Sequence, residues 1–341
     1  MKIQKQQLID VLTTIRPALA KKAIIEQATH FIFCGDKVLS YNDRICIATP
    51  FETDFICSIN AEEFYKILTS ILQEEVEIKL VDQKLKITAK KLNVLLTTED
   101  GSAILKMVET LELDRIQKLL KPLPTEFRKA ISLCSFSAAK DMSNPILTCV
   151  FVGDNKVASS DNLRISEYTL SESIKTTFLF PATSAIELAK FELDKFAISP
   201  TNNWVYFTTN TGAIFCSRLM SDDYPDYGQF LSCNKDIEIV LPSETIQLVE
   251  TAAILACGDD DQNKEVEINI SNNKLRCRGE NKLGWIESES DIKTNQTIDF
   301  IINPIFLLMI LTYTHTMNFD ESKIIFKSEN FKHTIALKAK E

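Results

Sequence analysis

Glycine, proline and histidine are scarce in this 341-residue sequence, which contains 8, 10 and 3 of them. The low glycine and proline counts exclude a collagen-like or low-complexity chain. With 45% apolar and 25% charged residues, the composition is that of a folded globular protein. Nine cysteines without any CxxC pair, together with only three histidines, argue against a disulfide framework and against a structural zinc site. We expect no metal and no cofactor.

The sequence also lacks a long apolar run. Its most apolar stretch, Phe300–Leu311, contains Asn303 and Pro304 and is shorter than the ~20 residues that span a bilayer. No apolar segment follows Met1, so we expect no secretory signal. These features predict a cytoplasmic protein with reduced thiols.

Arginine is the scarcer basic residue, with 8 arginines against 30 lysines. Arginine is the side chain best suited to reading base edges, so sequence-specific DNA recognition is not expected. The formal net charge is −9, from 38 basic and 47 acidic residues, which speaks against a protein that coats nucleic acid. A local basic surface on an acidic molecule is still compatible with these numbers.

A long internal repeat is the most informative feature of the sequence. Three similar strand pairs contain a lysine after a polar turn, at Lys37, Lys156 and Lys274, in steps of 119 and 118 residues. An amphipathic helix is predicted ahead of each strand pair, over 6–15, 125–134 and 243–253.

A third landmark follows each strand pair and reads as strand, helix cap and helix, with caps at Asn60, Pro181 and Asn303. Alternating strands around a polar turn come after each of these helices. The repeat predicts an α+β fold of three tandem similar domains, each made of two βαβββ halves with antiparallel sheets. The predicted domains are residues 1–115, 116–233 and 234–341.

No catalytic constellation is present in the sequence. The nearest match to a phosphate-binding loop, Gly279–Trp285, has tryptophan where the lysine is needed, and a hairpin turn explains it better. Asp259–Asp261 lacks the alternating ligands of a calcium loop. His315 and His333 have no apparent ligand partners, and we expect them at a surface or sheet edge. We therefore expect that the protein is not an enzyme.

Several strings, together with the repeat along essentially the whole chain, resemble one known family, the bacterial beta sliding clamps. Ser217–Tyr227 resembles the family's stretch ending in Phe-Pro-Asp-Tyr, and Asn144–Val150 resembles its Arg-Pro-Ile-Leu-Thr-Gly-Val. Ser160–Ile165 resembles its Thr-Asp-Gly-His-Arg-Leu. Thr251–Leu255 and Ile302–Phe306 are similar to parts of its third domain.

The resemblance implies a DNA sliding clamp, a ring-shaped homodimer with sheets outside and helices inside. Such a ring encircles double-stranded DNA without sequence preference and tethers the replicative polymerase as a processivity factor. An ATP-driven clamp loader made of other proteins places it on DNA. The alternative is a divergent clamp paralogue that acts as a regulatory or interaction protein without stimulating a polymerase.

The resemblance and helix spacing also suggest site residues. The predicted DNA-binding residues are Lys5, Arg16, Lys21, Lys22, Lys66, Arg128, Lys129, Lys140 and Lys190, although each alone is equally compatible with a solvated surface position. Lys5 and Arg16 are spaced to share a helix face, as are Lys129 and Lys140. The helices predicted in the third domain, 243–256 and 304–314, contain no lysine or arginine.

Partner peptides of the family dock in a groove. The matching positions are Asn144, Leu147, Ser160, Asn162, Leu163, Arg164, Ile165, Asn303, Phe306, Ala336 and Leu337, for which packing at a domain junction is the alternative reading. Several are substitutions relative to the family, and the C-terminal tail lacks the family's proline. The predicted dimer interface joins Ile254 and Leu255 to Val94 and Leu96 of the neighbour, and core packing is the alternative for the last two.

Overall fold

The computed structural model describes residues 1–22, 25–233 and 237–338. They form two compact units. The first unit is Met1–Lys129 with Phe178–Asp222, and the second is Ala130–Thr177 with Asp223–Glu341. The three predicted domains are defined by the sequence repeat, and that division stays a prediction.

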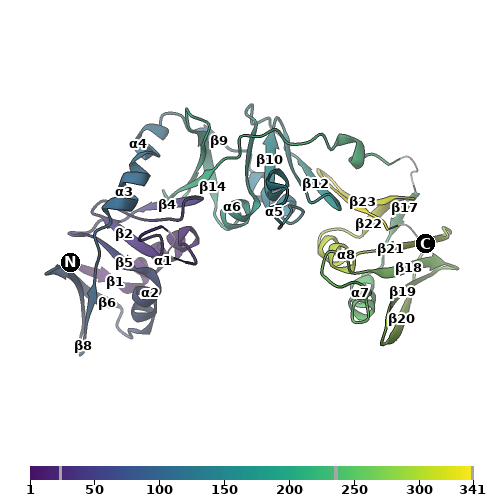
Figure 1. Cartoon of the computed structure of the whole chain (residues 1–341), viewed down its shortest axis with the longest axis horizontal. Helices are drawn as coiled ribbons and strands as arrows, with labels where there is room; N and C mark the ends of the chain where they lie inside the picture. The colour runs from purple at the N-terminus through teal and green to yellow at the C-terminus, as the bar shows by residue number, and fades with distance from the viewer. Residues whose placement is uncertain (23–24, 234–236, 339–341) are drawn as a thin grey trace. The chain divides into compact units, whose positions relative to one another are not determined.

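Two antiparallel sheets organise the first unit (Figure 1). The larger has the order β5-β2-β3-β4-β16-β15-β14-β9 and the smaller the order β1-β6-β7-β8. The strands of the larger sheet are β2 (His30–Cys34), β3 (Lys37–Tyr41), β4 (Ile45–Pro50), β5 (Ile56–Asn60), β9 (Lys121–Pro122), β14 (Leu193–Ile198), β15 (Trp204–Thr209) and β16 (Ile214–Arg218). Those of the smaller sheet are β1 (Lys2–Gln4), β6 (Glu75–Val81), β7 (Lys84–Ala89) and β8 (Leu92–Thr97).

Helices cover both faces of the larger sheet in the first unit. Successive strand residues point to opposite faces. The Phe33 ring contacts Phe64 of α2 at 6.0 Å, whereas the neighbouring Ile32 packs in a cluster with Ile104 and Val108 of α3. The helical elements of this unit are α1 (Lys5–Ile15), η1 (Arg16–Ala18), α2 (Ala61–Ser70), α3 (Ser102–Glu109), α4 (Leu113–Ile116) and α6 (Ala182–Leu188), the last following strand β13 (Phe178–Pro181).

The second unit repeats the combination of a large and a small antiparallel sheet. In the large sheet the strands run β10-β11-β12-β24-β23-β22-β17, and in the small one β20-β19-β18-β21. Their bounds are β10 (Cys149–Gly153), β11 (Lys156–Ser160), β12 (Arg164–Thr169), β17 (Ile237–Val240), β18 (Val266–Ser271), β19 (Lys274–Asn281), β20 (Gly284–Asp291), β21 (Ile298–Ile302), β22 (Thr316–Asp320), β23 (Lys323–Ser328) and β24 (Phe331–Ala336).

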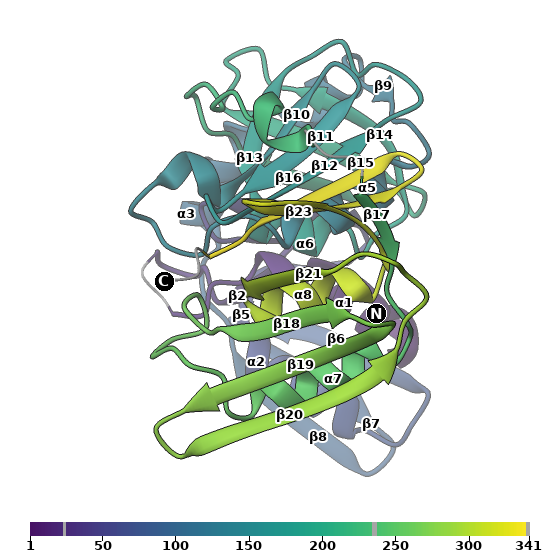
Figure 2. The same cartoon turned by 90° about the vertical axis from the view of Figure 1, so that its right-hand side faces the viewer.

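Two helices lie behind the small sheet of the second unit, α7 (Thr245–Ala253) and α8 (Pro304–Leu311), as Figure 2 shows. The α7 helix contacts β19, β20 and α8. It approaches β19 so closely at Gly279 that a Cβ there would lie 1.9 Å from the carbonyl oxygen of Ala252. The remaining helical elements are α5 (Phe127–Ser135), which leads from the first unit into the second, η2 (Pro145–Thr148) and η3 (Gly228–Leu231).

The predicted α+β class with antiparallel sheets is confirmed. The three repeated lysines, Lys37, Lys156 and Lys274, are the first residues of β3, β11 and β19. The predicted caps are the N-caps of α2, α6 and α8, namely Asn60, Pro181 and Asn303. None of the helices in the described part of the chain is long and apolar enough to cross a membrane.

Residues 102–116, for which no helix was predicted, form α3 and α4, because Ile104, Val108 and Ile116 bury against the sheet. One local prediction is wrong. His333, expected at a surface or edge, is fully buried in β24.

Candidate functional site

A tight turn in the second unit places Arg164 at the start of β12. The Oδ1 atom of Asp161 accepts hydrogen bonds from the backbone N–H groups of Leu163 (3.1 Å) and Arg164 (3.0 Å). Asn162 has a φ of +71°, a conformation that asparagine tolerates better than most residues. The Ser160 hydroxyl donates to the Arg164 carbonyl at 2.9 Å, which closes the turn. The turn therefore fixes the direction in which the arginine side chain leaves the strand.

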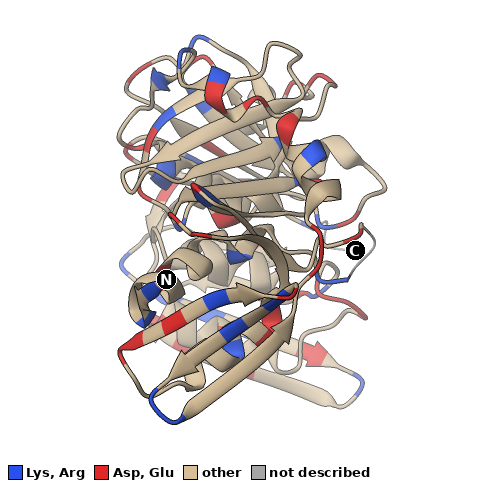
Figure 3. Ribbon diagram, turned by 90° about the vertical axis from the view of Figure 1, so that its left-hand side faces the viewer, with Lys and Arg blue, Asp and Glu red and all other residues tan. Residues whose placement is uncertain are grey.

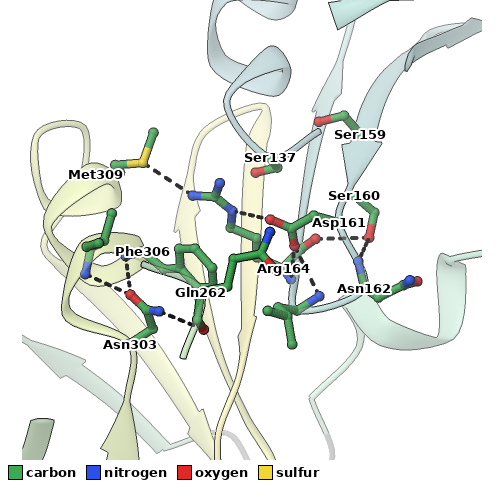
Figure 4. A network of polar contacts seen from close by, with 12 residues as sticks. Ser137, Ser159, Ser160, Asp161, Asn162, Arg164, Gln262, Asn303, Phe306 and Met309 are labelled. Atoms are coloured by element: carbon green, nitrogen blue, oxygen red, sulfur yellow. Dashed lines mark hydrogen bonds and ion pairs between the residues drawn. The ribbon is translucent and has the colours of Figure 1, made fainter. Parts of the chain in front are cut away.

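The Arg164 guanidinium is buried among groups that suit its charge (Figure 4). Its Nε donates to Asp161 Oδ2 at 2.9 Å, and its Cζ lies 4.1 Å from the centre of the Phe306 ring. Its Nη1 lies 3.3 Å from the sulfur of Met309. Burial lowers the pKa of Arg164, and the neighbouring Asp161 carboxylate opposes that effect. The cation is thus held at one position instead of moving in solvent.

Asn303 anchors the helix that carries Phe306. Its Oδ1 accepts the backbone N–H groups of Ile305 (2.9 Å) and Phe306 (3.3 Å), which caps α8. Its Nδ2 donates to the carbonyl oxygens of Asp261 and Gln262, at 2.9 and 3.0 Å. All of these partners are backbone groups of the same chain. Asn303 therefore fixes the first turn of α8, and with it the Phe306 ring that contacts Arg164.

A groove of about 500 Å³ lies beside this cluster, within the second unit. One wall comes from the Arg164 turn and η2, and the other from the segment that includes η3. The lining residues are Leu147, Ser160, Asn162, Leu163, Arg164, Ile165, Tyr224, Pro225, Asp226, Tyr227, Gln229, Phe230, Ser322, Lys323, Thr334 and Ala336. The site combines apolar side chains with a few fixed polar groups, as small-ligand and peptide sites do.

The second wall is held to the sheet through a backbone carbonyl. The Phe230 carbonyl accepts hydrogen bonds from Lys323 Nζ (3.2 Å) and from the Thr334 hydroxyl (3.3 Å). These bonds leave the Phe230 side chain exposed at the groove mouth. Tyr224 and Tyr227 pack edge to face at 6.0 Å, and burial raises the pKa of both hydroxyls above the usual value. Apart from Asp226 and Gln229, the side chains that this segment contributes to the groove are aromatic or apolar.

Seven of the eleven residues predicted for the groove line it. They are Leu147, Ser160, Asn162, Leu163, Arg164, Ile165 and Ala336. Of the others, Asn303 and Phe306 lie behind Arg164, and Asn144 and Leu337 are not among the lining residues. The second wall was missed as a site, although its Tyr224–Tyr227 string carried part of the family resemblance.

A buried polar chain runs from the groove's supporting cluster into the sheet. His333 Nδ1 lies 2.8 Å from the Ser166 hydroxyl and 3.4 Å from the Ser137 hydroxyl. Burial and the Arg164 charge lower the pKa of His333 to about 3, so the ring is neutral at pH 7. Because all three side chains are closed off from solvent or nearly so, this serine–histidine arrangement cannot reach a substrate and acts in packing.

The structure places four of the predicted DNA-binding cations beside internal acceptors. Lys66 pairs with Glu62 at 2.5 Å, Arg128 with Glu192 at 2.5 Å, and Lys190 with Glu187 at 2.7 Å. The fourth, Lys5, donates to the carbonyl oxygen of Ile71 at 2.5 Å. Exposed pairs of this kind are weak and exchange readily. The paired glutamates nevertheless reduce the positive electrostatic potential around Lys66, Arg128 and Lys190.

The five other predicted cations differ in their surroundings. Arg16 begins η1, just after α1, and stacks on Tyr65 of α2 at 4.4 Å. Lys21, Lys22, Lys129 and Lys140 are exposed, and none forms an ion pair within the described ranges. Lys140 does not share a helix face with Lys129, as the spacing suggested, because α5 ends at Ser135.

The predicted interface residues lie in an edge strand of one small sheet and just after α7, the helix that packs on the other small sheet. Val94 and Leu96 are half-buried in β8, an edge strand of the first unit. Ile254 follows the last residue of α7 and is 72% exposed, while Leu255 is half-buried. In the second unit the matching edge strand is β20, which α7 contacts.

No protein-family model and no curated protein matches the sequence. Solved structures do match along nearly the whole chain. The beta subunit from DNA polymerase of Streptococcus pyogenes is 19% identical, with a TM-score of 0.83 and 99% of each chain covered. The DNA polymerase sliding clamp from Bacillus subtilis is 19% identical, with a TM-score of 0.82, covering 100% of this chain and 99% of its own.

The DNA polymerase III beta subunit from Thermotoga maritima is 16% identical, with a TM-score of 0.81 and coverage of 100% of this chain and 99% of its own. At these identities the likeness shows the fold alone. The chain has the fold of the bacterial beta sliding clamps, and the resemblance inferred from the sequence is confirmed at that level.

Proposed function

We propose that the protein is a DNA sliding clamp, a ring-shaped homodimer that encircles double-stranded DNA and tethers a replicative polymerase. The observation that carries the proposal is the end-to-end match to sliding clamps, with coverage of 99% or more of this chain and TM-scores of 0.81 to 0.83 in three cases. Because it covers the whole chain, the match includes the segments that form both small sheets, the groove and the helices. Each part of the proposed function uses one of these features.

Ring closure would use the two open sheet edges. An exposed edge strand presents unpaired N–H and C=O groups, which favour pairing with another strand. β8 is one of the two edge strands of the first small sheet, and β20 is one of the two edge strands of the second. Because the two edges belong to different parts of the chain, a contact between them is head-to-tail, and two such contacts can close a dimer.

Charge favours this contact. Residues 84–98, the β7–β8 hairpin and the residue after it, contain four lysines and no acidic residue. β20 contains Glu287, Glu289 and Asp291 and no basic residue, although Arg276 and Lys274 of the adjacent β19 already pair with Glu289 and Asp291. Figure 3 shows the first unit's face with its basic residues in blue. Opposite charges at two edges raise the rate of encounter and penalise pairing of like edges.

DNA would be held by threading and not by affinity. The helices that the family resemblance places around DNA are α1, α2, α5, α6, α7 and α8, which together contain four basic and five acidic residues. Each phosphate contact strengthens salt-sensitive binding to a duplex. A nearly neutral lining therefore gives little direct affinity and lets a closed ring move along the duplex.

The groove beside Arg164 would take a short, extended and partly apolar peptide from the polymerase or the loader. Its apolar walls and fixed polar groups support this use. The protein would thus work as a cytoplasmic scaffold and not as an enzyme, loaded onto DNA by an ATP-driven complex of other proteins.

The second candidate is a clamp paralogue that regulates or binds other proteins without stimulating a polymerase. The lack of lysine and arginine in α7 and α8, and the departures at Ser160, Asn162 and Leu163 from the family's groove, favour it. Extension of a primed circular template by the polymerase and loader from the same organism separates the two. Long products that require this protein support the clamp, and unchanged product length with a DNA-bound ring supports the paralogue.

A further inference from the structure

One of the two tryptophans is exposed on an edge strand. Trp204 is 8% exposed, whereas Trp285, in β20, is 60% exposed. The Cζ of Arg278 lies 4.8 Å from the Trp285 ring centre, and Arg278 is itself paired with Glu280 at 2.7 Å. The Arg278 guanidinium therefore stacks on the ring, while most of the ring surface stays open to solvent.

Strand register defines the sheet face on which Trp285 lies. A Cβ at Gly279 would point at α7, and Gly279 is paired with Ile286. Paired residues share a face and adjacent ones alternate, so Trp285 lies on the face away from α7. Glu287, Glu289 and Asp291 follow it on that face at intervals of two residues.

The other open edge presents the complementary pattern. In β8, Val94 pairs with the buried Ile87, so Leu95 lies on the opposite face, where it pairs with Lys86. Leu95 is 57% exposed, and Lys84 lies two residues before Lys86 on the same face. One edge therefore has an exposed tryptophan beside acidic residues, and the other has an exposed leucine beside lysines.

We propose that Trp285 anchors the contact between two copies of this chain by packing against Leu95 of the second copy, with Lys86 and Lys84 near Glu287, whereas Glu289 is already paired with Arg276 of its own chain. The inference rests on the proposed homodimer, and it adds an apolar contact on the exposed sheet face to the one predicted at Ile254 and Leu255. Buried aromatic residues with an aliphatic partner and a charged surround are common energetic centres of interfaces.

The test uses Trp285 as its own reporter. In a Trp204→Phe chain, Trp285 is the only tryptophan, so its emission reports burial at that site. Diluting the dimer to monomer is expected to shift this emission to longer wavelength as the ring becomes exposed to water. Trp285→Ala is expected to raise the dimer dissociation constant by about 30-fold, and Leu95→Ala by a smaller factor. Sedimentation equilibrium of the full chain measures these constants.

Leu72→Ala is the matched control, because Leu72 is 91% exposed but lies between α2 and β6, away from both edges; it should leave the constant unchanged. The double variant Trp285→Ala with Leu95→Ala should raise the dimer dissociation constant by less than the product of the two single increases, since the two residues share one contact. Two results would overturn the inference without contradicting the proposed homodimer. One is a Trp285 emission that does not change when the dimer is diluted to monomer. The other is a double variant whose dissociation constant rises by the full product of the two single increases. A chain that never dimerises would overturn both.

Discussion

Substituting Gly279 by alanine tests how the position of α7 depends on one close contact. The added Cβ would lie 1.9 Å from the carbonyl oxygen of Ala252 and 3.3 Å from the carbonyl carbon of Leu255. Real Cβ atoms do not approach backbone this closely, so the end of α7 must move away from β19. The movement would displace Ile254 and Leu255, which follow that helix end.

The expected cost follows from two opposing effects. Overpacking costs about 1–3 kcal/mol, while replacing glycine by alanine recovers about 0.4–1 kcal/mol by restricting the unfolded chain. We therefore expect Gly279→Ala to lower the free energy of unfolding by about 1–2 kcal/mol. Urea titration followed by circular dichroism measures this change. Sedimentation of the same variant should show a weaker dimer.

Gly228→Ala is the control for this experiment. A Cβ at Gly228 would meet nothing closer than the Asp226 carboxylate at 3.5 Å, which is ordinary van der Waals contact. Its stability should be unchanged or slightly higher. If Gly279→Ala were as stable as Gly228→Ala and dimerised normally, the close approach of α7 to β19 would be incorrect.

Three other predictions concern the interface, DNA retention and pH. The double change Ile254→Ala and Leu255→Ala should convert dimers to monomers in size-exclusion chromatography with light scattering, and an unaltered dimer would remove both residues from the interface. Replacing Lys21 and Lys22 by glutamate should shorten the residence time on circular DNA without changing the melting temperature; equal residence times would exclude them as DNA contacts. His333 should make stability fall as pH falls from about 6.5 towards 3, because the unfolded histidine binds a proton throughout this window and the buried one does not. The loss should approach ~1.4 kcal/mol per pH unit in denaturant titrations, and His333→Gln should reduce this slope; an identical slope in the variant would refute the assignment.

Elements with strong local signals could be predicted from the sequence. The caps Asn60 and Asn303 each follow an apolar strand and precede a helix, and their side chains accept backbone N–H groups as asparagine caps usually do. The repeated lysines at strand starts follow polar turns, another local pattern. The Arg164 turn could also be placed, because Asp161 and Asn162 favour tight turns.

Features that depend on distant contacts could not be predicted. The second groove wall exists because Lys323 and Thr334 bind the Phe230 carbonyl, about a hundred residues away in sequence, and no local pattern indicates that. His333 alternates with Phe331 and Ile335 on one face of β24, so the pattern is compatible with burial, but its partners Ser137 and Ser166 come from distant segments that no local pattern indicates. Lys140 and Lys129 do not share a helix face because α5 ends at Ser135, one residue after the predicted end, and a spacing of eleven residues does not show that a helix joins the two lysines.

The central claim is that DNA is held by encirclement. The most direct measurement loads the protein on a nicked circular plasmid, passes the mixture through a gel-filtration column at high salt, and repeats the run after a restriction enzyme has cut the plasmid once. We predict that the protein elutes with the circle and is lost from the linear molecule, because a closed ring slides off a free end. Equal retention on both forms, or loss from both, would contradict the account.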